Sequence, residues 1–244
     1  MSRWQAFLIH LGISLTAFGA IAYCAVSIWY PDFLFTTDGG YQGLRLLLGV
    51  QLVVGPLLTL IVYRNGKRGL RTDLTIIGAL QVACLSMGVW IVYAERPLAI
   101  VYVDGSFYTV SAQTFREVNE PIPDLDAFPG AYPKWLSVSL PQDYTEQSMI
   151  RGKMLGQGRM LATLSSRYVP FRMEDIDPRE ARTVSEILDR DRDTAATQLW
   201  LQAHAGSLDD YRYFPFGARY AFAYLGFDGT DGRFAGYLAT PAPR

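Results

Sequence analysis

The stretch LLLGVQLVVGPLLTLIVYRNGKRGLR, residues 46–71, decides the fold of this chain. Its first part, Leu46 to Tyr63, contains no charged residue and is long enough to cross the hydrocarbon core of a bilayer as a helix. Its second part, Arg64 to Arg71, holds four basic side chains in eight residues. An uncharged run followed by a short basic loop is typical of a membrane-spanning helix with a cytoplasmic loop.

Two further apolar runs flank this stretch and predict two more spans. One extends from Ala6 to Tyr30, and His10 is its one histidine; the other extends from Leu74 to Tyr93. Aromatic residues lie at or near the ends of the three runs, where their rings favour the headgroup layer. They are Trp29, Tyr30, Tyr41, Tyr63, Trp90 and Tyr93. We therefore expect spans at about residues 6–30, 46–63 and 74–93.

Two other interpretations of the apolar runs are weaker. Ala20-Ile21-Ala22 is similar to the small-residue cleavage pattern of a signal peptide. The apolar stretch continues to Tyr30, however, beyond the short core of such a peptide, which favours a retained span. A soluble all-α core also holds apolar helices, but three nearly uncharged runs with aromatic ends favour a membrane region.

The basic residues of the short loops predict the orientation. The link before Arg45 contains Asp32 and Asp38 and no basic residue, whereas the Arg64–Arg71 loop is strongly basic. The positive-inside rule then places the N-terminus and this loop in the cytoplasm. Three crossings put the residues after Tyr93 on the far side, which is the periplasm in a bacterium. The predicted location is the bacterial inner membrane.

Charge is distributed unevenly and predicts two domains. Residues 1–93 contain six basic and three acidic side chains, whereas residues 94–244 contain sixteen and twenty. We expect a transmembrane region over 1–93, whose partner is the lipid bilayer, and a periplasmic domain over 94–244. The overall balance of 22 Lys and Arg against 23 Asp and Glu argues against nucleic acid as a partner. Both cysteines, Cys24 and Cys84, lie inside spans, so no disulfide is expected in the exported domain.

The exported domain shows signals of an α+β fold with a mainly antiparallel sheet. Asp104-Gly105 predicts a tight turn in a hairpin over Ala99–Val110, and a second hairpin is expected over Ala218–Leu238. Four prolines make residues 119–134 an irregular loop. Between the hairpins we expect a strand over 135–140 and helices over 145–164, from Asp177 onward, and over 194–205.

Catalytic and metal-binding motifs are weak. His204 is the one histidine of the exported domain, and a structural role is its default interpretation. Asp189, Asp191 and Asp193 have the spacing of a calcium loop but lack its glycine and final glutamate. Gly156-Gln157-Gly158 is an incomplete dinucleotide motif. We expect no enzyme activity, no metal, no cofactor and no small-molecule substrate.

The second apolar run contains the most unusual residues of the membrane region. Arg45 begins the run, Gln51 lies six residues further in, and Gly49, Gly55 and Pro56 interrupt it. Polar residues at membrane depth are costly and suggest function. Two interpretations stay open. Arg45 reaches back to the interface while Gly49 allows close packing, or this helix forms a groove that receives a helix of another protein.

Several motifs in the N-terminal part carry a family resemblance. They occur in order from Ser2 to Arg96-Pro97 and are SRWQAF (2–7), WYPDFLF (29–35), DGG (38–40) and GVQLVVGPLLTLIV (49–62). Together they resemble the TfpX/TfpZ family of type IV pilin accessory proteins. One position departs from the family, which often has Asp where this chain has Gln51, so an Arg45–Asp ion pair is replaced here by a hydrogen bond at most.

The resemblance implies an inner-membrane protein that assists a type IV major pilin in its stability, membrane handling or assembly. The pilin helix typically carries an acidic residue, which Arg45 would meet, and a free edge of either hairpin would pair with a pilin strand. The expected partner-binding residues are Asp38, Gly39, Gly40, Arg45, Gly49, Gln51, Gly55 and Pro56. Two alternatives stay open: a periplasmic sensor that signals through a partner, and a membrane-bound enzyme that modifies pilin with His204 as its base.

Overall fold

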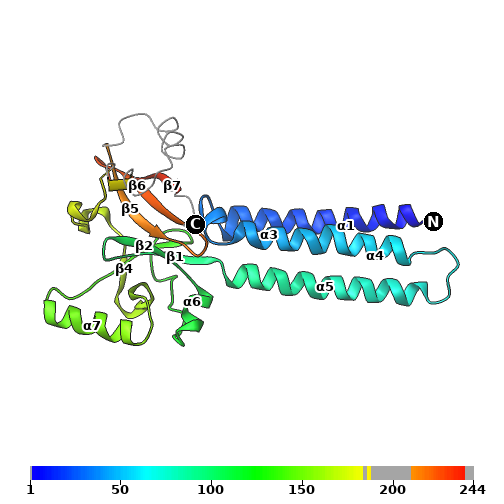
Figure 1. Cartoon of the computed structure of the whole chain (residues 1–244), viewed down its shortest axis with the longest axis horizontal. Coiled ribbons are helices and arrows are strands. Elements are labelled where there is room, and N and C mark those ends of the chain that lie inside the picture. Colours follow the sequence, from blue (N-terminus) through cyan, green and yellow to red (C-terminus); the bar gives the residue numbers. More distant parts are fainter. Residues whose placement is uncertain (1, 184–185, 188–209, 240–244) are drawn as a thin grey trace. The chain divides into compact units, whose positions relative to one another are not determined.

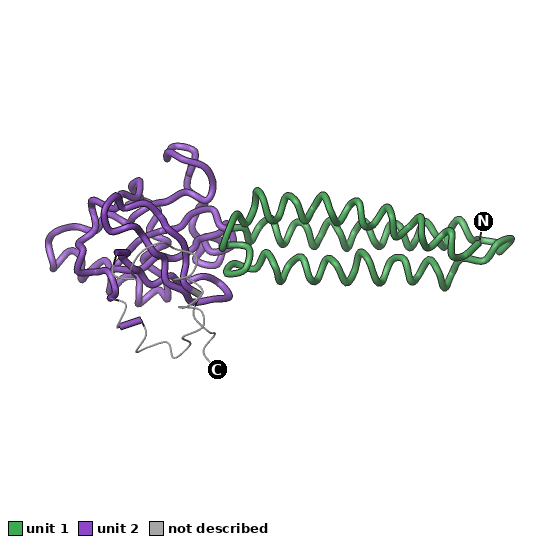
Figure 2. Tube along the Cα trace, turned by 90° about the horizontal axis from the view of Figure 1, so that it is seen from above, with its two compact units in different colours: residues 1–96 green, residues 97–244 purple. Residues whose placement is uncertain are grey.

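The computed structural model describes residues 2–183, 186–187 and 210–239 of the chain. The chain divides into two compact units, which we call the helical unit (residues 1–96) and the sheet unit (residues 97–244) (Figure 2). Each unit is described by itself below.

The helical unit contains three long helical stretches, residues 3–29, 40–62 and 70–94, each long and apolar enough to cross a membrane (Figure 1). The three predicted helices are thereby confirmed as helices, with different bounds. Their elements in chain order are α1 (Arg3–Cys24), the π-helical turn η1 (Ala25–Trp29), the short α2 (Leu34–Thr37), α3 (Gly40–Leu48), the π-helical turn η2 (Gly49–Val54), α4 (Gly55–Val62) and α5 (Leu70–Ala94).

The second stretch begins six residues before the predicted Leu46, so Arg45 lies inside the helix and not at its start. Gly39 makes this earlier start possible, because its φ of 101° is a conformation that glycine adopts without strain. The first helical bond then runs from the Gly43 amide to the Gly39 carbonyl at 2.9 Å. Apolar periodicity alone does not reveal this turn, because residues 40–45 are largely polar or small.

Close packing joins the second and third stretches at two points, which are four residues apart on each stretch. A Cβ added at Gly43 would lie 2.6 Å from Val92 Cγ2, and one at Gly88 would lie 2.5 Å from Leu47 Cδ2. The buried Tyr30 donates its hydroxyl proton to the Val92 carbonyl at 2.7 Å, which ties the end of the first stretch to the third. Small residues therefore set the distance between these helices, as is common where helices associate in lipid.

The sheet unit contains one seven-stranded sheet in the described residues, in the order β4-β3-β1-β2-β5-β6-β7 (Figure 1). Four neighbouring pairs are antiparallel, but β1 pairs with β3 and β2 pairs with β5 in parallel. The strands are β1 (Pro97–Val103), β2 (Ser106–Ser111), β3 (Lys134–Val138), β4 (Tyr168–Pro170), β5 (Tyr211–Gly217), β6 (Phe222–Asp228) and β7 (Phe234–Ala239).

The predicted mainly antiparallel sheet is wrong, because the sheet is mixed. Hairpin signals in a sequence identify only antiparallel neighbours, whereas a parallel neighbour is reached by a long connection. Here the chain leaves β2, forms α6 (Ala112–Glu117) and crosses residues 119–133 without a further helix or strand before β3 lies parallel to β1. The sequence analysis predicts neither the helix α6 nor the strand β5.

Both predicted hairpins are present, but the first one has no free edge. Asp104 and Gly105 adopt φ angles of 52° and 71°, as the predicted turn between β1 and β2 requires. On its outer sides β1 is paired with β3 and β2 with β5, so the Ala99–Val110 hairpin lies in the middle of the sheet. The expectation that a partner strand pairs with its edge is therefore wrong for this hairpin.

Two helix predictions in the sheet unit need correction. The helix α7 spans Tyr144–Gly156 and stops eight residues before the predicted Leu164. Gly158 terminates it with a φ of 64°, and the Arg159 amide donates back to the Met154 carbonyl at 2.9 Å.

The helix expected from Asp177 onward is a short 3₁₀ turn, Pro178–Glu180. Two residues later the Arg182 amide donates to the Tyr213 carbonyl at 2.7 Å, so the chain pairs with β5 at that point. Residues 186 and 187 are helical again, and the Ile187 amide donates to the Thr183 carbonyl at 3.2 Å. The predicted helix over 194–205, His204 and the three alternating aspartates at 189, 191 and 193 lie outside the described residues.

The core of the sheet unit covers both sides of β1, because successive side chains of a strand point to opposite faces. Val101 packs with buried apolar residues that include Val110, Phe115 and Leu136. The neighbouring Tyr102 lies in a group of aromatic rings, with its centroid 4.9 Å from that of Phe107. Both cysteines belong to the helical unit and are free, so no disulfide stabilises the sheet unit. Its apolar core has to support the fold alone.

Candidate functional site

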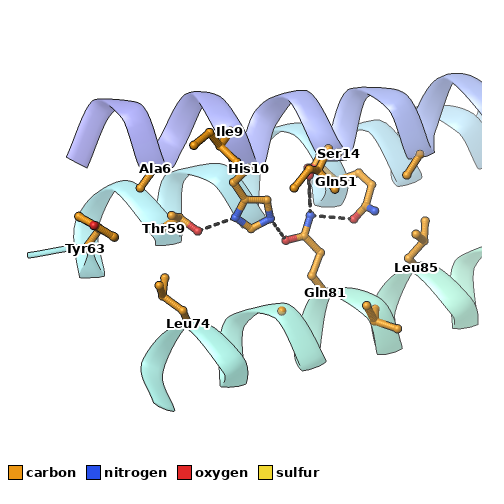
Figure 3. A pocket seen from close by; sticks show the side chains of 14 residues that line it. Ala6, Ile9, His10, Ser14, Gln51, Thr59, Tyr63, Leu74, Gln81 and Leu85 are labelled. Atoms are coloured by element: carbon orange, nitrogen blue, oxygen red, sulfur yellow. Dashed lines mark hydrogen bonds between the residues drawn. The ribbon is translucent and has the colours of Figure 1, made fainter. Parts of the chain in front are cut away.

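Five polar side chains from all three long helical stretches meet inside the helical unit, and we call them the polar cluster (Figure 3). They are His10 and Ser14 on α1, Gln51 in η2, Thr59 on α4 and Gln81 on α5. Ser14, Gln51 and Thr59 are each at most 4% exposed. Each of the five has a hydrogen bond to another member of the cluster.

His10 links the other two long stretches through its two ring nitrogens. Its Nδ1 lies 2.6 Å from Thr59 Oγ1, and its Nε2 lies 2.6 Å from the carbonyl oxygen of the Gln81 side chain. Because an amide oxygen only accepts, Nε2 carries a proton and donates to Gln81. In the neutral ring Nδ1 then accepts a hydrogen bond from the Thr59 hydroxyl. These two partners therefore select the tautomer that carries its proton on Nε2.

Gln81 is the centre of the polar cluster. While its oxygen accepts from His10, its Nε2 faces Ser14 Oγ at 3.0 Å and Gln51 Oε1 at 3.0 Å. The same nitrogen is 3.3 Å from the main-chain oxygen of Gln51. One side chain on α5 therefore holds both other stretches. Interhelical bonds of this kind are worth about 0.6 kcal/mol each on average in membrane proteins.

The contact to the Gln51 main-chain oxygen follows from Pro56. In a helix this oxygen would accept from the amide of residue 55 or, in a π turn, of residue 56. The Gly55 amide donates instead to the Val50 carbonyl, and Pro56 has no N–H. The Gln51 carbonyl is thus left without a main-chain donor, and the side chain of Gln81 takes that place. Proline also explains why the helix widens into a π turn here, since its ring would collide with the preceding turn.

Gly55 provides the space in which Gln81 lies. A Cβ at this position would be 2.1 Å from Gln81 Oε1 and 2.5 Å from its Nε2. Gly49 is different, because a Cβ there would meet no atom within 4 Å. Of the two glycines, only Gly55 is required for the present packing.

A pocket of about 450 Å³ lies beside the polar cluster and is lined by residues of all three long stretches (Figure 3). Apart from the five polar side chains and Tyr63, its walls are aliphatic or glycine. The lining residues are Ala6, Ile9, His10, Ile13, Ser14, Ala17, Gln51, Thr59, Tyr63, Leu74, Gly78, Gln81, Val82 and Leu85. The arrangement offers hydrogen bonds in an apolar groove, and its described lining contains no aspartate, glutamate, lysine or arginine.

The eight residues predicted to bind a partner do not form one site. Gln51 is part of the polar cluster, Gly55 adjoins it and Pro56 is buried next to Gly55. Arg45 is exposed and lies over the ring of Tyr41 at 5.6 Å. Neither it nor Gly49 lines the pocket. No hydrogen bond joins Arg45 to Gln51 in the described part of the helical unit.

The other three predicted residues lie in the turn before α3 and stabilise it. Asp38 is buried and accepts a hydrogen bond from the Thr37 hydroxyl at 2.7 Å. Gly39 provides the left-handed conformation, and a Cβ at Gly40 would lie 2.6 Å from the Phe35 ring. These residues have a structural role in the turn.

Sequence reasoning missed most of the polar cluster. It singled out only Gln51 and gave no binding role to His10, Ser14, Thr59 or Gln81. The signal was present for Gln81, which stands in the middle of the third apolar run as Gln51 does in the second. The same argument about polar residues at membrane depth applies to both.

The sheet unit shows little that resembles a reactive centre among its described residues. No group of three or more His, Cys, Asp or Glu with metal-ligand geometry is found within residues 2–183, 186–187 and 210–239. Burial and a hydrogen bond to Glu180 raise the pKa of Tyr102 well above its usual value, and burial raises the pKa of Tyr168. Both tyrosines therefore stay neutral and act as structural donors.

Relatives of the chain are found among fimbrial assembly proteins of Dichelobacter nodosus. The protein of serogroups C1 and C2 is 30% identical over 96 residues, which cover 38% of this chain and 73% of that relative. This chain belongs to the same family of fimbrial assembly proteins.

In two other members of the family, the matched region covers a smaller share of the relative's length. The serogroup I protein is 30% identical over 96 residues, 38% of this chain and 37% of the relative. The serogroup E1 protein is 27% identical over 125 residues, 50% of this chain and 49% of the relative. The match thus spans between about a third and a half of these two proteins. No family model and no solved structure matches the chain.

Proposed function

We propose that this chain is an inner-membrane accessory protein that assists a type IV major pilin in its stability, membrane handling or assembly into fibres. The names of its relatives support a role in pilus assembly. Three helices of membrane length support an action within the bilayer. The resemblance of residues 2–97 to pilin accessory proteins narrows the role to the pilin.

The polar cluster is the observation that carries the proposal. Polar side chains inside a bilayer are costly and are kept where they serve a function. Here His10 and Gln81 connect three helices into one bundle and leave a groove beside them. A pilin awaiting assembly is held in the membrane by one apolar helix. A small bundle with a groove is a suitable partner for such a helix.

The proposed topology places the N-terminus and the Arg64–Arg71 loop in the cytoplasm and the sheet unit in the periplasm. Four basic residues in that loop support this orientation. The sheet unit is then on the same side of the membrane as the globular part of a pilin. We further propose that the chain is not an enzyme and acts by binding alone.

Co-purification tests the proposal against its alternatives. The full chain, solubilised in mild detergent from cells that make type IV pili, is expected to retain the major pilin. Retention of a kinase or cyclase without pilin would favour the sensor instead. A His204→Ala variant that loses pili while its own abundance and fold are unchanged would favour the pilin-modifying enzyme.

A further inference from the structure

The amide nitrogen of Gln51 has no hydrogen-bond partner among the described residues. Its side-chain oxygen accepts from Gln81, but its Nε2 takes part in no contact of hydrogen-bond length with the part of the chain that is described. The residue is only 4% exposed and lines the pocket. It lies 11 residues inside the helix that begins at Gly40, which is about 16 Å from that end. Lipid at this depth offers no acceptor for an amide.

The pocket extends along two of the helices that line it. Its α1 wall extends from Ala6 to Ala17 and its α5 wall from Leu74 to Leu85, in both cases at intervals of three or four residues. Each wall is therefore about 16 Å long and parallel to the helix axis. Figure 3 shows α1 and α5 facing each other across the polar cluster, with the second stretch behind it.

Small residues and open space mark the walls of this groove. A Cβ at Gly78 would meet no atom within 4 Å, and Ala6 and Ala17 line the opposite wall. Helices approach each other closely in lipid where such small residues occur. A fourth helix between α1 and α5 would complete a four-helix bundle, which is a common way to cover three helices.

We propose that this groove docks a membrane-spanning helix of another protein, and that a hydrogen-bond acceptor on that helix binds the free amide protons of Gln51. The inference rests on the proposed function, which places the partner in the bilayer. An acyl chain would fill the apolar volume but would leave the amide without an acceptor. The acceptor is a carboxylate, an amide oxygen or a hydroxyl, because these are the side-chain acceptors available on a helix.

Site-specific photocrosslinking in living, piliated cells tests the proposal. A benzophenone side chain at Ile13, which is 66% exposed and lines the groove, is expected to capture a membrane protein through its transmembrane helix. The same probe at Leu15, which is 56% exposed and outside the groove, serves as the matched control. The captured peptide is identified by mass spectrometry and is expected to contain an acceptor side chain.

Two variants connect the capture to Gln51. Gln51→Leu removes the free amide and is expected to lower the Ile13 adduct about three- to twentyfold, the range of one interhelical hydrogen bond. Ser14→Ala also removes an acceptor of Gln81 but keeps the Gln51 amide, so the adduct is expected to persist. Gly78→Leu fills the open wall and is expected to abolish the adduct.

The outcomes separate this proposal from the proposed function. A pilin adduct at Ile13 that depends on Gln51 supports both. A different identified membrane protein at Ile13 supports the docking groove and contradicts the pilin assignment. Pilin captured at Leu15 but not at Ile13 overturns the groove while the pilin assignment stands. An adduct at Ile13 with a second copy of this chain also overturns the docking proposal. Labelling of lipid at Ile13 without any protein adduct overturns it as well.

Discussion

The side chain of Gln81 occupies the space that a side chain at Gly55 would need. A Cβ on Gly55 would lie 2.1 Å from Gln81 Oε1, far inside any contact distance. The two residues are 26 positions apart and belong to α4 and α5. Gln81 bonds to His10, Ser14 and Gln51 from this position, so a side chain at residue 55 would displace the atoms that make these bonds.

Gly55→Ala is expected to destabilise the helical unit by about 1–3 kcal/mol, the usual cost of an extra methyl group in a filled site. The added carbon displaces Gln81 and breaks its bonds to the other helices. Denaturant unfolding of the purified full chain in detergent measures this change.

Gly49→Ala is the matched control on the same helical stretch. A Cβ there meets no atom within 4 Å, and alanine is a better helix former than glycine. Its stability is expected to be equal to or higher than that of the wild type. Equal losses in the two variants would contradict the assigned role of Gly55.

His10 and Gln81 are expected to be energetically coupled. A double-mutant cycle with His10→Leu and Gln81→Leu should give a coupling free energy of about 0.6 kcal/mol, and at most about 1.7, the range found for interhelical hydrogen bonds. The measurement is the unfolding free energy of the four proteins in the same detergent. Strict additivity of the two single effects would show that the 2.6 Å contact adds nothing to stability.

The proposed topology predicts the behaviour of reporter fusions. Alkaline phosphatase fused after Ala239 is expected to be active, and fused within the Arg64–Arg71 loop it is expected to be inactive. A reporter that works only in the cytoplasm should give the opposite pattern. Activity of phosphatase in the loop would place the sheet unit in the cytoplasm and end the account of its periplasmic role.

Asp228 makes the stability of the β6–β7 turn depend on pH. A hydrogen bond from the Thr230 hydroxyl, with further bonds from the Thr230 and Asp231 amides, lowers the pKa of Asp228 below its usual value of 3.8. A carboxylate with a lowered pKa stabilises the fold above its unfolded pKa, and this contribution is lost as pH falls through the folded pKa.

Asp228→Asn is therefore expected to be less stable than the wild type at neutral pH, with a difference that shrinks below about pH 4. Unfolding curves of both proteins from pH 7 to pH 3 measure it. A difference that is constant over this range would show that the carboxylate charge is irrelevant to the turn.

Local chemistry explains which parts of the fold were predictable. Asp104-Gly105 determines its turn through two adjacent residues, and the three apolar helices are evident from their composition. The parallel pairs β1–β3 and β2–β5 depend on where a long connection returns, which no local pattern specifies. The early end of α7 depends on a single left-handed residue, Gly158, within a helical pattern.

The candidate site was only partly predictable for a similar reason. Gln51 and Gly55 are recognisable in the sequence because they interrupt an apolar run; Gln51 belongs to the polar cluster and Gly55 adjoins it. The sequence does not say that Gln51 meets Gln81, 30 residues away, or that Gly55 makes room for it and Gly49 does not. The latter distinction depends on which face of the helix is packed.

Surface piliation in a clean deletion strain tests the central claim, a role in assisting the major pilin, most directly. We expect deletion to reduce both the amount of pilin in the membrane and the number of assembled pili. Wild-type protein and the Gly49→Ala variant should restore them, whereas Gly55→Ala should restore them less well. Unchanged pilin levels and normal pili in the deletion strain would contradict the account.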